Sequence, residues 1–375
     1  MRNLFISITL FTAIGVTSCK TSGSQSIEEA PVFDLEGNVD AEVSKPVKVY
    51  DLTYTPLSDD VQEAFFKSAN IIDVVGDTVL LFEDNHHASR LIMFNLRDGR
   101  YLGQINHQGQ GPGEYTSILG AFVDGSKQTV MLPDFFSPKV NVYSLTADSL
   151  IGTIDREYVQ SMMEPIGNVE SCINVAVPIE EGLKIMQYDR NYSLTDSISL
   201  PGFEGGNFST IWANAGTEGI FMGGDTIFAL QPGILKPIAI ADRGKFTITP
   251  EIDQKIIMEI LDSGESEIEI LKPYMLIRNV RFTDDKMLIT TMHNAKKNSD
   301  LYDMSTGKLI YRNTYDALEK PSSIVITGEN NRPLQIESLF AKNGIWYALV
   351  SEDVVAQSAD TNSEDANCAL VSFRF

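Results

Sequence analysis

The stretch ANIIDVVGDTVLLFEDNHHASRLIMFNLRDGRYLGQIN, residues 69–106, determines the fold that this sequence predicts. It divides into β-rich runs over residues 69–75, 78–83, 90–95 and 100–106. Gly76-Asp77 separates the first two runs, and Asp98-Gly99 forms a hairpin-turn pair between the last two. Short β-rich runs joined by tight turns predict one antiparallel sheet of four strands.

The same unit recurs along the chain, which indicates a repeat architecture. Further copies are predicted at about 119–154, 169–200, 211–242, 276–314 and 336–375. The last copy lacks its fourth strand, whereas Val47–Thr53 is an extra strand in front of the first copy. If that strand completes the last sheet, the ring closes and no unpaired edge remains. The sequence therefore predicts an all-β, six-bladed β-propeller over residues 47–375, closed by an N-terminal strand; an irregular β-sandwich or two small β-domains is the alternative.

Composition and charge exclude several classes of protein. The chain has 51 Asp+Glu against 29 Lys+Arg, a net charge of −22. Nucleic-acid binding is excluded on this basis, because phosphate contacts need clustered Lys and Arg. Adsorption to anionic lipid headgroups is disfavoured for the same reason. The three cysteines are too few for a disulfide framework.

The N-terminus has the pattern of an export signal. Arg2 precedes the apolar stretch Leu4–Val16, which is too short to span a bilayer of roughly 30 Å as a helix. Small residues then lead into Cys19, which resembles the lipobox of bacterial lipoproteins, where the cysteine thiol is acylated. We predict a signal peptide over residues 1–18, lipidation of Cys19, and a flexible polar tether over residues 19–46. An ordinary secretory signal is the alternative.

A glycine-rich segment, Gly109-Gln110-Gly111-Pro112-Gly113-Glu114-Tyr115, follows the first repeat. Gly109, Gly111 and Gly113 permit a positive φ or a close backbone approach, and Pro112 fixes φ between them. The segment is therefore predicted to be a structural turn from the outer strand of blade one to the inner strand of blade two. A contribution of Glu114 or Tyr115 to a ligand site is the alternative.

This segment, placed after the Asp98-Gly99 hairpin, resembles the Bacteroidetes six-bladed β-propeller lipoproteins described as TolB-like or NHL-like. The resemblance implies the propeller fold, an outer-membrane location, and a role in binding or scaffolding, and it supplies no catalytic residues. Some lipoproteins of that group reach the cell surface through acidic residues directly after the cysteine. Here Lys20-Thr21-Ser22-Gly23 follow Cys19, which favours the periplasmic face.

One face of the ring is predicted to carry the ligand site, because the loop between the second and third strands and the connection between blades share that face. It would gather the candidate ligand-binding residues His86, His87, Arg90, Glu114, Tyr115, Asp134, Phe135, Phe136 and His293. No metal site or cofactor is predicted. Adjacent histidines in an extended segment point to opposite sides, and no catalytic sequence motif occurs.

A single amphipathic helix is predicted inside the repeats. Thr249 is a suitable N-cap before Pro250, and Gly264 ends the segment. One face carries Ile252, Ile256, Ile257, Ile260 and Leu261. This face predicts packing against the ring, with a lid or a partner surface as the alternative.

These features together predict a monomeric lipoprotein of the cell envelope, attached to the outer membrane through its lipid anchor alone. Its predicted role is to bind a peptide, a glycan or an envelope protein at the loop-rich face, since a rigid ring can present variable loops. An enzyme is the less favoured reading. The rival hypotheses are a metal-dependent hydrolase or lyase of the NHL-propeller type, and a purely structural subunit of an envelope assembly.

Overall fold

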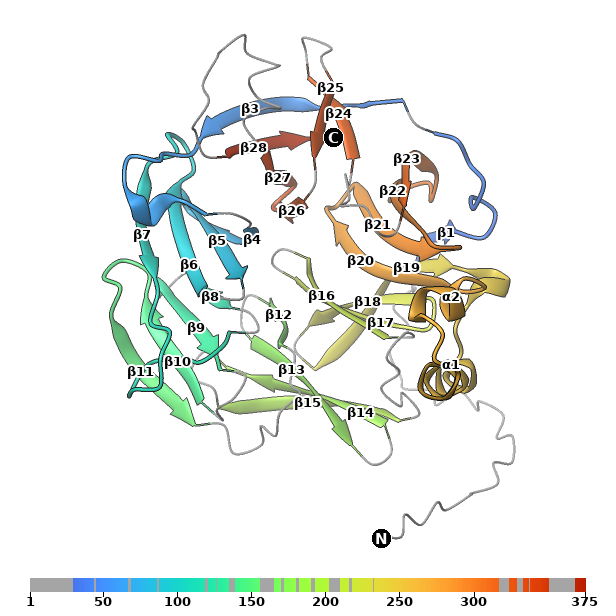
Figure 1. Cartoon of the computed structure of the whole chain (residues 1–375), viewed down its shortest axis with the longest axis horizontal. Coiled ribbons are helices and arrows are strands. Elements are labelled where there is room, and N and C mark those ends of the chain that lie inside the picture. The colour runs from blue at the N-terminus through green and yellow to red at the C-terminus, as the bar shows by residue number, and fades with distance from the viewer. Residues whose placement is uncertain are drawn as a thin grey trace, which may run out of the picture.

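The chain forms a six-bladed β-propeller in the computed structural model (Figure 1). The structure describes residues 30–43, 45–66, 69–85, 88–118, 121–125, 127–134, 139–155, 165–169, 172–179, 182–189, 193–201, 210–215, 218–231, 233–316, 324–328, 333–336, 338–350 and 368–375. Each blade is a four-stranded antiparallel sheet whose first strand lies nearest the centre. The predicted fold is confirmed.

The blades follow one another along the chain. Blade one is β4 (Asn70–Val75), β5 (Thr78–Asn85), β6 (Ala88–Asn95) and β7 (Tyr101–Ile105); blade two is β8 (Phe122–Asp124), β9 (Thr129–Pro133), β10 (Lys139–Ser144) and β11 (Leu150–Asp155). Blade three is β12 (Pro165–Val169), β13 (Cys172–Ile179), β14 (Gly182–Tyr188) and β15 (Leu194–Pro201); blade four is β16 (Thr210–Ala215), β17 (Glu218–Gly223), β18 (Thr226–Gln231) and β19 (Ile234–Asp242). Blade five is β20 (Met275–Phe282), β21 (Lys286–His293), β22 (Lys296–Asp303) and β23 (Leu309–Asp316); blade six is β26 (Ser338–Lys342), β27 (Ile345–Val350), β28 (Ala369–Arg374) and β3 (Tyr50–Pro56).

All six blades have a register shift between their third and fourth strands. In blade one, Met93 and Phe94 pair with Gly103 and Tyr101, so Leu102 is the extra residue of β7. In blade two, Ile151 is extra in β11 in the same way. A bulge increases the local twist, which suits strongly twisted blades arranged around an axis. Leu102 and Ile151 are therefore structurally equivalent positions.

The ring closes through β3, which pairs antiparallel with β28. The closing strand was predicted at Val47–Thr53 and is found at Tyr50–Pro56. Residues Val47–Lys48 instead form β2, which pairs in parallel with β24 (Ile324–Thr327). With β25 (Pro333–Ile336) they make an additional three-stranded sheet that the sequence analysis missed. An ion pair between Lys342 of blade six and Asp73 of blade one, 2.5 Å long, also joins the two ends of the ring.

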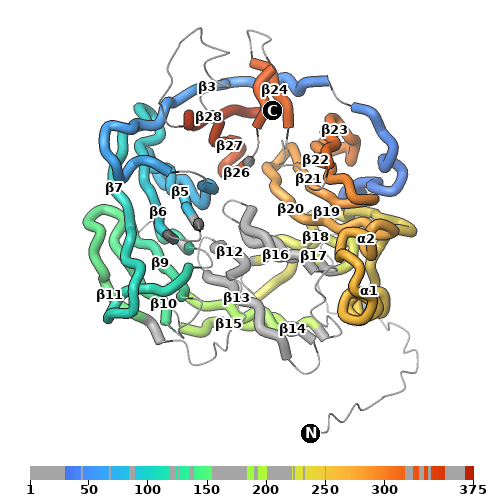
Figure 2. Tube along the Cα trace, in the orientation of Figure 1, coloured from blue at the N-terminus to red at the C-terminus, as the bar shows by residue number. Residues whose placement is uncertain are grey.

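The flexible tether predicted for residues 19–46 is wrong for residues 32–43, which we call the N-terminal strap. Its strand β1 (Val32–Asp34) pairs in parallel with the outer strand β19 of blade four. Phe33 and Leu35 are 0% exposed, and the Phe33 ring lies 4.9 Å from that of Tyr302 in blade five. These apolar side chains and the otherwise open edge of β19 bring the segment onto the ring. Figure 2 shows the strap running along the outside of the ring before β3.

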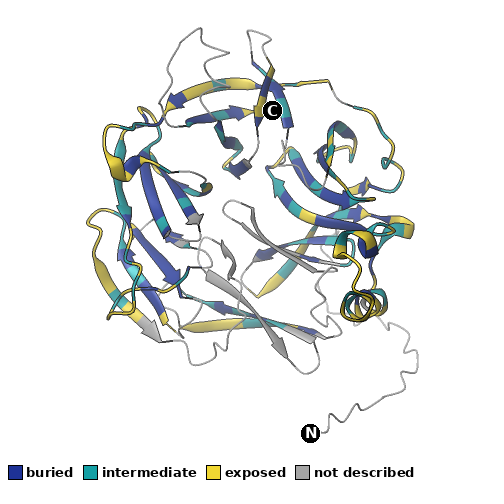
Figure 3. Cartoon of the chain, in the orientation of Figure 1, coloured by how far each residue is buried: buried dark blue, intermediate teal, exposed yellow. Residues whose placement is uncertain are grey.

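The predicted helix is present as α1 (Pro250–Ser263), followed by the short α2 (Glu267–Leu271). The Thr249 hydroxyl accepts a hydrogen bond from the Ile252 amide at 3.4 Å, and Gly264 has a φ of +68°. Ile256 is buried against blade five. The helix α1 lies at the outer edge of the ring rather than over its centre (Figures 1 and 3). Leu261 is 73% exposed, so its predicted place on the packed face is wrong. The described residues also form the 3-10 turns η1 (Gln62–Ala64) and η2 (Gly244–Phe246).

Candidate functional site

The glycine-rich segment packs into the outer part of the seam between blades one and two. The Gly109 amide donates to the Tyr115 carbonyl at 2.9 Å, and the Tyr115 amide donates to the His107 carbonyl at 3.1 Å. The Glu114 carboxylate accepts a hydrogen bond from the Gly111 amide at 2.6 Å. A Cβ atom on Gly109 would lie 2.0 Å from the Glu114 carboxylate, so only glycine leaves room for this contact. The Glu114 carboxylate thus stabilises the turn in which it lies.

Tyr115 lies beneath this turn and is fully buried. Its hydroxyl donates to the Ser89 carbonyl at 2.8 Å and accepts from the His107 amide at 3.2 Å. Burial raises the pKa of Tyr115 well above its usual value. Its ring meets Tyr143 of blade two edge-on at 6.4 Å. These contacts place Tyr115 in the packing between the blades.

Arg90 lies close to the same connection but bonds to its own blade. Its Nε donates to Glu83 at 2.8 Å, and its Nη1 donates to the Gln104 side chain at 2.6 Å and the Glu63 carbonyl at 2.9 Å. Its Nη2 donates to the Phe65 carbonyl. The guanidinium therefore fastens the segment around η1 to blade one.

Asp134 and His293 were also predicted as ligand-binding residues. Asp134 is buried and accepts hydrogen bonds from the Thr116 amide at 3.1 Å and the Ser117 amide at 3.4 Å. His293 lies in blade five, with Nδ1 2.9 Å from the Tyr274 carbonyl oxygen, so it does not join the other candidates. The remaining predicted residues lie outside the described part of the chain: Cys19, His86, His87, Phe135 and Phe136.

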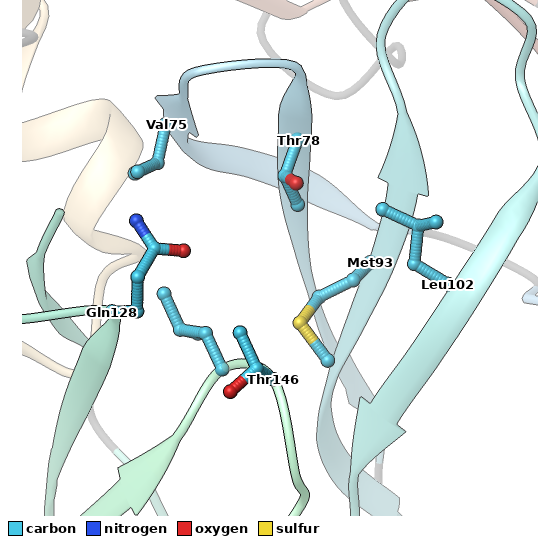
Figure 4. Close-up of a pocket in the computed structure, with 7 residues that line it drawn as sticks. Val75, Thr78, Met93, Leu102, Gln128 and Thr146 are labelled. Atoms are coloured by element: carbon cyan, nitrogen blue, oxygen red, sulfur yellow. The ribbon is translucent and has the colours of Figure 1, made fainter.

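A pocket that the sequence analysis missed opens in the same seam. Its volume is about 250 Å³. Figure 4 shows residues that line it. Blade one contributes Val75, Thr78, Met93 and Leu102, and blade two contributes Gln128, Leu145 and Thr146. These residues lie at or near the turns between first and second strands and between third and fourth strands, so the pocket opens on the face opposite to the predicted one. No short motif marks it, because its lining comes from turns and strands that are remote in sequence.

The described residues of the pocket lining carry no charged side chain. Its apolar residues are Val75, Met93, Leu102 and Leu145, and its polar residues are Thr78, Gln128 and Thr146. The Gln128 amide is held in place by a 2.6 Å hydrogen bond to the Gly125 carbonyl. Met93 adds a flexible wall that adapts to what it contacts. A neutral, partly apolar group fits this lining best, because a charge would be desolvated there without a partner.

Two further features bear on function. Within the described residues, no three His, Cys, Asp or Glu side chains converge as a metal site would require. Among the helices in the described part of the chain, none combines the length and apolar character that crossing a membrane requires.

Comparison with known proteins agrees with this architecture. Residues 22–168 match the DUF5128 family model, described as a 6-bladed beta-propeller. The fold is similar to a crystal structure of a Bacteroides fragilis protein described as exported, with 17% identity, a TM-score of 0.63, and coverage of 89% of this chain and 99% of that one. It is also similar to a DUF4221 family member from Bacteroides vulgatus, with 9% identity, a TM-score of 0.50, and coverage of 88% and 97%. No curated protein sequence matches the chain significantly.

Proposed function

We propose that this protein is an exported β-propeller, anchored to the outer membrane through acylated Cys19, that binds a peptide or protein partner. The partner seats one uncharged side chain in the pocket between blades one and two. The pocket, with its charge-free lining, is the observation that carries this proposal. A similar fold in a protein described as exported, together with the lipobox-like residues before Cys19, supports the location.

The pocket favours a peptide over a glycan. Its volume of about 250 Å³ is below the roughly 300–1,000 Å³ that encloses a whole small-molecule ligand. It suits one side chain of a larger partner instead. Sugars are commonly held by aromatic stacking and many hydrogen bonds, and no aromatic ring is among the described residues of the lining. A leucine- or methionine-sized group would bury apolar surface against Met93 and Leu102.

Leu102→Glu tests the binding site. A displayed peptide library is selected on the immobilised protein, and the affinity of each selected peptide is then measured for the wild type and the variant. We expect the peptides to share one apolar residue, and Leu102→Glu to weaken their binding at least tenfold, since it places a carboxylate at the pocket. Ile151→Glu is the matched control, because Ile151 is the equivalent bulge residue in blade two, is 59% exposed and is not in the lining. Equal losses in both variants would reject the pocket as the binding site.

Cys19→Ser tests the location. Cells fed an alkyne-labelled fatty acid should label the wild type and leave the variant unlabelled, and only the wild type should sediment with outer membranes. Added protease that spares the protein in intact cells but digests it in permeabilised cells would support the periplasmic face. An unlabelled wild type would refute the lipid anchor and leave the binding proposal untouched.

A further inference from the structure

Arg281 occupies an unusual position on β20, the innermost strand of blade five. Its Nη1 donates to the Asn279 side-chain oxygen at 2.6 Å and to the Val280 carbonyl at 2.9 Å. Its Nε is buried and has no hydrogen-bond partner among the described residues. No bond from its Nη2 is present in that part of the chain either. One edge of the guanidinium is therefore bonded to the protein. The opposite edge, with Nε and Nη2, makes no hydrogen bond to the described residues, and we call it the open edge.

Guanidinium groups use the donors of this edge to form two parallel hydrogen bonds to two oxygen atoms. Blade five itself shows this use. Arg312 donates from Nε to one oxygen of Asp300 at 2.7 Å and from Nη2 to the other at 2.6 Å. Arg281 presents the same pair of donors, Nε and Nη2, and no acid among the described residues bonds to them. Unpaired buried donors and an uncompensated charge are costly, so a site that keeps them calls for an explanation.

The surroundings of Arg281 bury its Nε atom without enclosing the whole residue. Arg281 pairs across the sheet with Leu288, which packs with Ala341 and Trp346 of blade six. Cross-strand partners share a face, so Arg281 lies at the inner edge of the seam between blades five and six. The residue as a whole is partly exposed. Burial without a neighbouring acid also lowers its pKa to about 10.

We propose that Arg281 is the anchor of a second binding site, distinct from the pocket between blades one and two, which takes a carboxylate through Nε and Nη2. A carboxylate fits better than a phosphate because one guanidinium neutralises one negative charge. A phosphate dianion would keep an excess charge inside a chain of net charge −22. The ligand is therefore a molecule that carries a carboxylate, presented to the centre of the ring.

Nuclear magnetic resonance of the arginine side chains tests this site directly. The Arg281 Nε–H signal is assigned by its loss in Arg281→Lys, and sodium acetate is then titrated at pH 7 against sodium chloride of equal ionic strength. We expect a saturable downfield shift with acetate alone, with a dissociation constant on the order of 10 mM for a single charge-assisted pair. Phosphate should bind more weakly than acetate.

Thermal unfolding supplies a second readout that does not need the arginine signal. Acetate should raise the unfolding midpoint of the wild type relative to chloride, because a ligand of the native state stabilises it. Arg281→Gln should lose that rise, and Arg281→Lys should lose at least tenfold in affinity because lysine lacks the two-pronged geometry. Arg278→Gln is the control, since it removes the same charge from an exposed site on the same strand.

Three results would overturn the proposal. The first is a shift with chloride equal to that with acetate, which indicates nonspecific screening. The second is an Nε–H signal already at a hydrogen-bonded position in acetate-free buffer and unmoved by titration. The third is an acetate-dependent rise that survives in Arg281→Gln.

Discussion

Blade five has an arginine on its inner strand and another on its outer strand, and the two differ in how far the protein satisfies their hydrogen bonds. On the outer strand, Arg312 is 3% exposed, holds Asp300 with two hydrogen bonds, and also donates to the Asn38 carbonyl of the strap. On the inner strand, Arg281 has its backbone-facing edge satisfied and its other edge open. The outer arginine is saturated by the protein itself, whereas the inner one is left with unused binding capacity.

This difference separates a structural role from a binding role more clearly than burial does. Arg90 and Arg243 resemble Arg312, because each bonds to both an acid and main-chain carbonyls. All three join segments that are distant in sequence. Within the described residues, Arg281 forms hydrogen bonds only to its own strand, so holding the fold together does not explain its place there.

The largest effect is expected at the outer edge. Asp300→Asn leaves the Arg312 charge buried without a counter-charge and should lower the free energy of unfolding by about 3–5 kcal/mol, measured by urea denaturation. Burial raises the pKa of Asp300 even beside Arg312, so the pair itself is costly to desolvate. The double variant Asp300→Leu/Arg312→Met should therefore recover to within about 1 kcal/mol of the wild type. A double variant as unstable as Asp300→Asn would show that the ion pair stabilises the fold by more than its desolvation costs.

A smaller effect is expected where the ring closes. Lys342→Met removes the partner of Asp73 and should cost about 2 kcal/mol at pH 7. Burial raises the pKa of Asp73 above its ordinary value of 3.8, and Lys342 opposes this rise. Without Lys342 the pKa of Asp73 in the folded protein rises further. The loss of stability in Lys342→Met is therefore full above that pKa and disappears as the pH falls toward 3.8.

Urea unfolding of wild type and Lys342→Met at several pH values between 7 and 4 measures this dependence. The control is the difference in stability between Asp73→Asn and Asp73→Asn/Lys342→Met, which should not change with pH because neither variant carries the Asp73 carboxylate. A loss that stays constant with pH would mean that Lys342 acts through packing rather than charge.

The smallest effect, and the one of opposite sign, is expected at the inner edge. Arg281→Met in carboxylate-free buffer should raise the free energy of unfolding by about 1 kcal/mol, because it removes a buried charge that has no counter-charge. The gain in stability should be full below pH 10 and shrink above it. The pKa of folded Arg281 is about 10, and the neutral group no longer carries the penalty of a buried charge. Arg278→Met should change stability by less than about 0.5 kcal/mol. A clear loss of stability in Arg281→Met would show that Arg281, like Arg312, stabilises the fold, and would contradict the difference drawn between the two edges.

The sequence predicts the ring well because its turns are local. Asp98-Gly99 in blade one and Thr306-Gly307 in blade five mark the same hairpin, and Gly99 and Gly307 have φ values of +68° and +67°. The strap was missed because Val32-Phe33 and Leu35 are few apolar residues in a polar stretch, and their partner strand β19 is some 200 residues away in the chain.

The site was less predictable than the fold. Glu114, Tyr115 and Asp134 were singled out by residue type and by their place in connections, and they bond to their own connection and neighbouring strand. Arg281 gave no signal, because Asn279-Val280-Arg281 reads as an ordinary strand. Whether a cation has a counter-charge depends on acids brought near in space, and the pocket likewise depends on how two sheets approach each other.

The strap lies between Cys19 and the strand that closes the ring, which has a consequence for any force applied at Cys19. A pull on a lipid anchor at Cys19 would enter the described chain just before β1 and act on its three-residue pairing with β19. Only after β1 detaches and the hydrogen bonds of Arg312 to Asn38 and Val43 break would tension reach β2 and then β3. If the chain is anchored at Cys19, a pulling force would therefore break the contacts of the strap before it reached the strand that closes the ring.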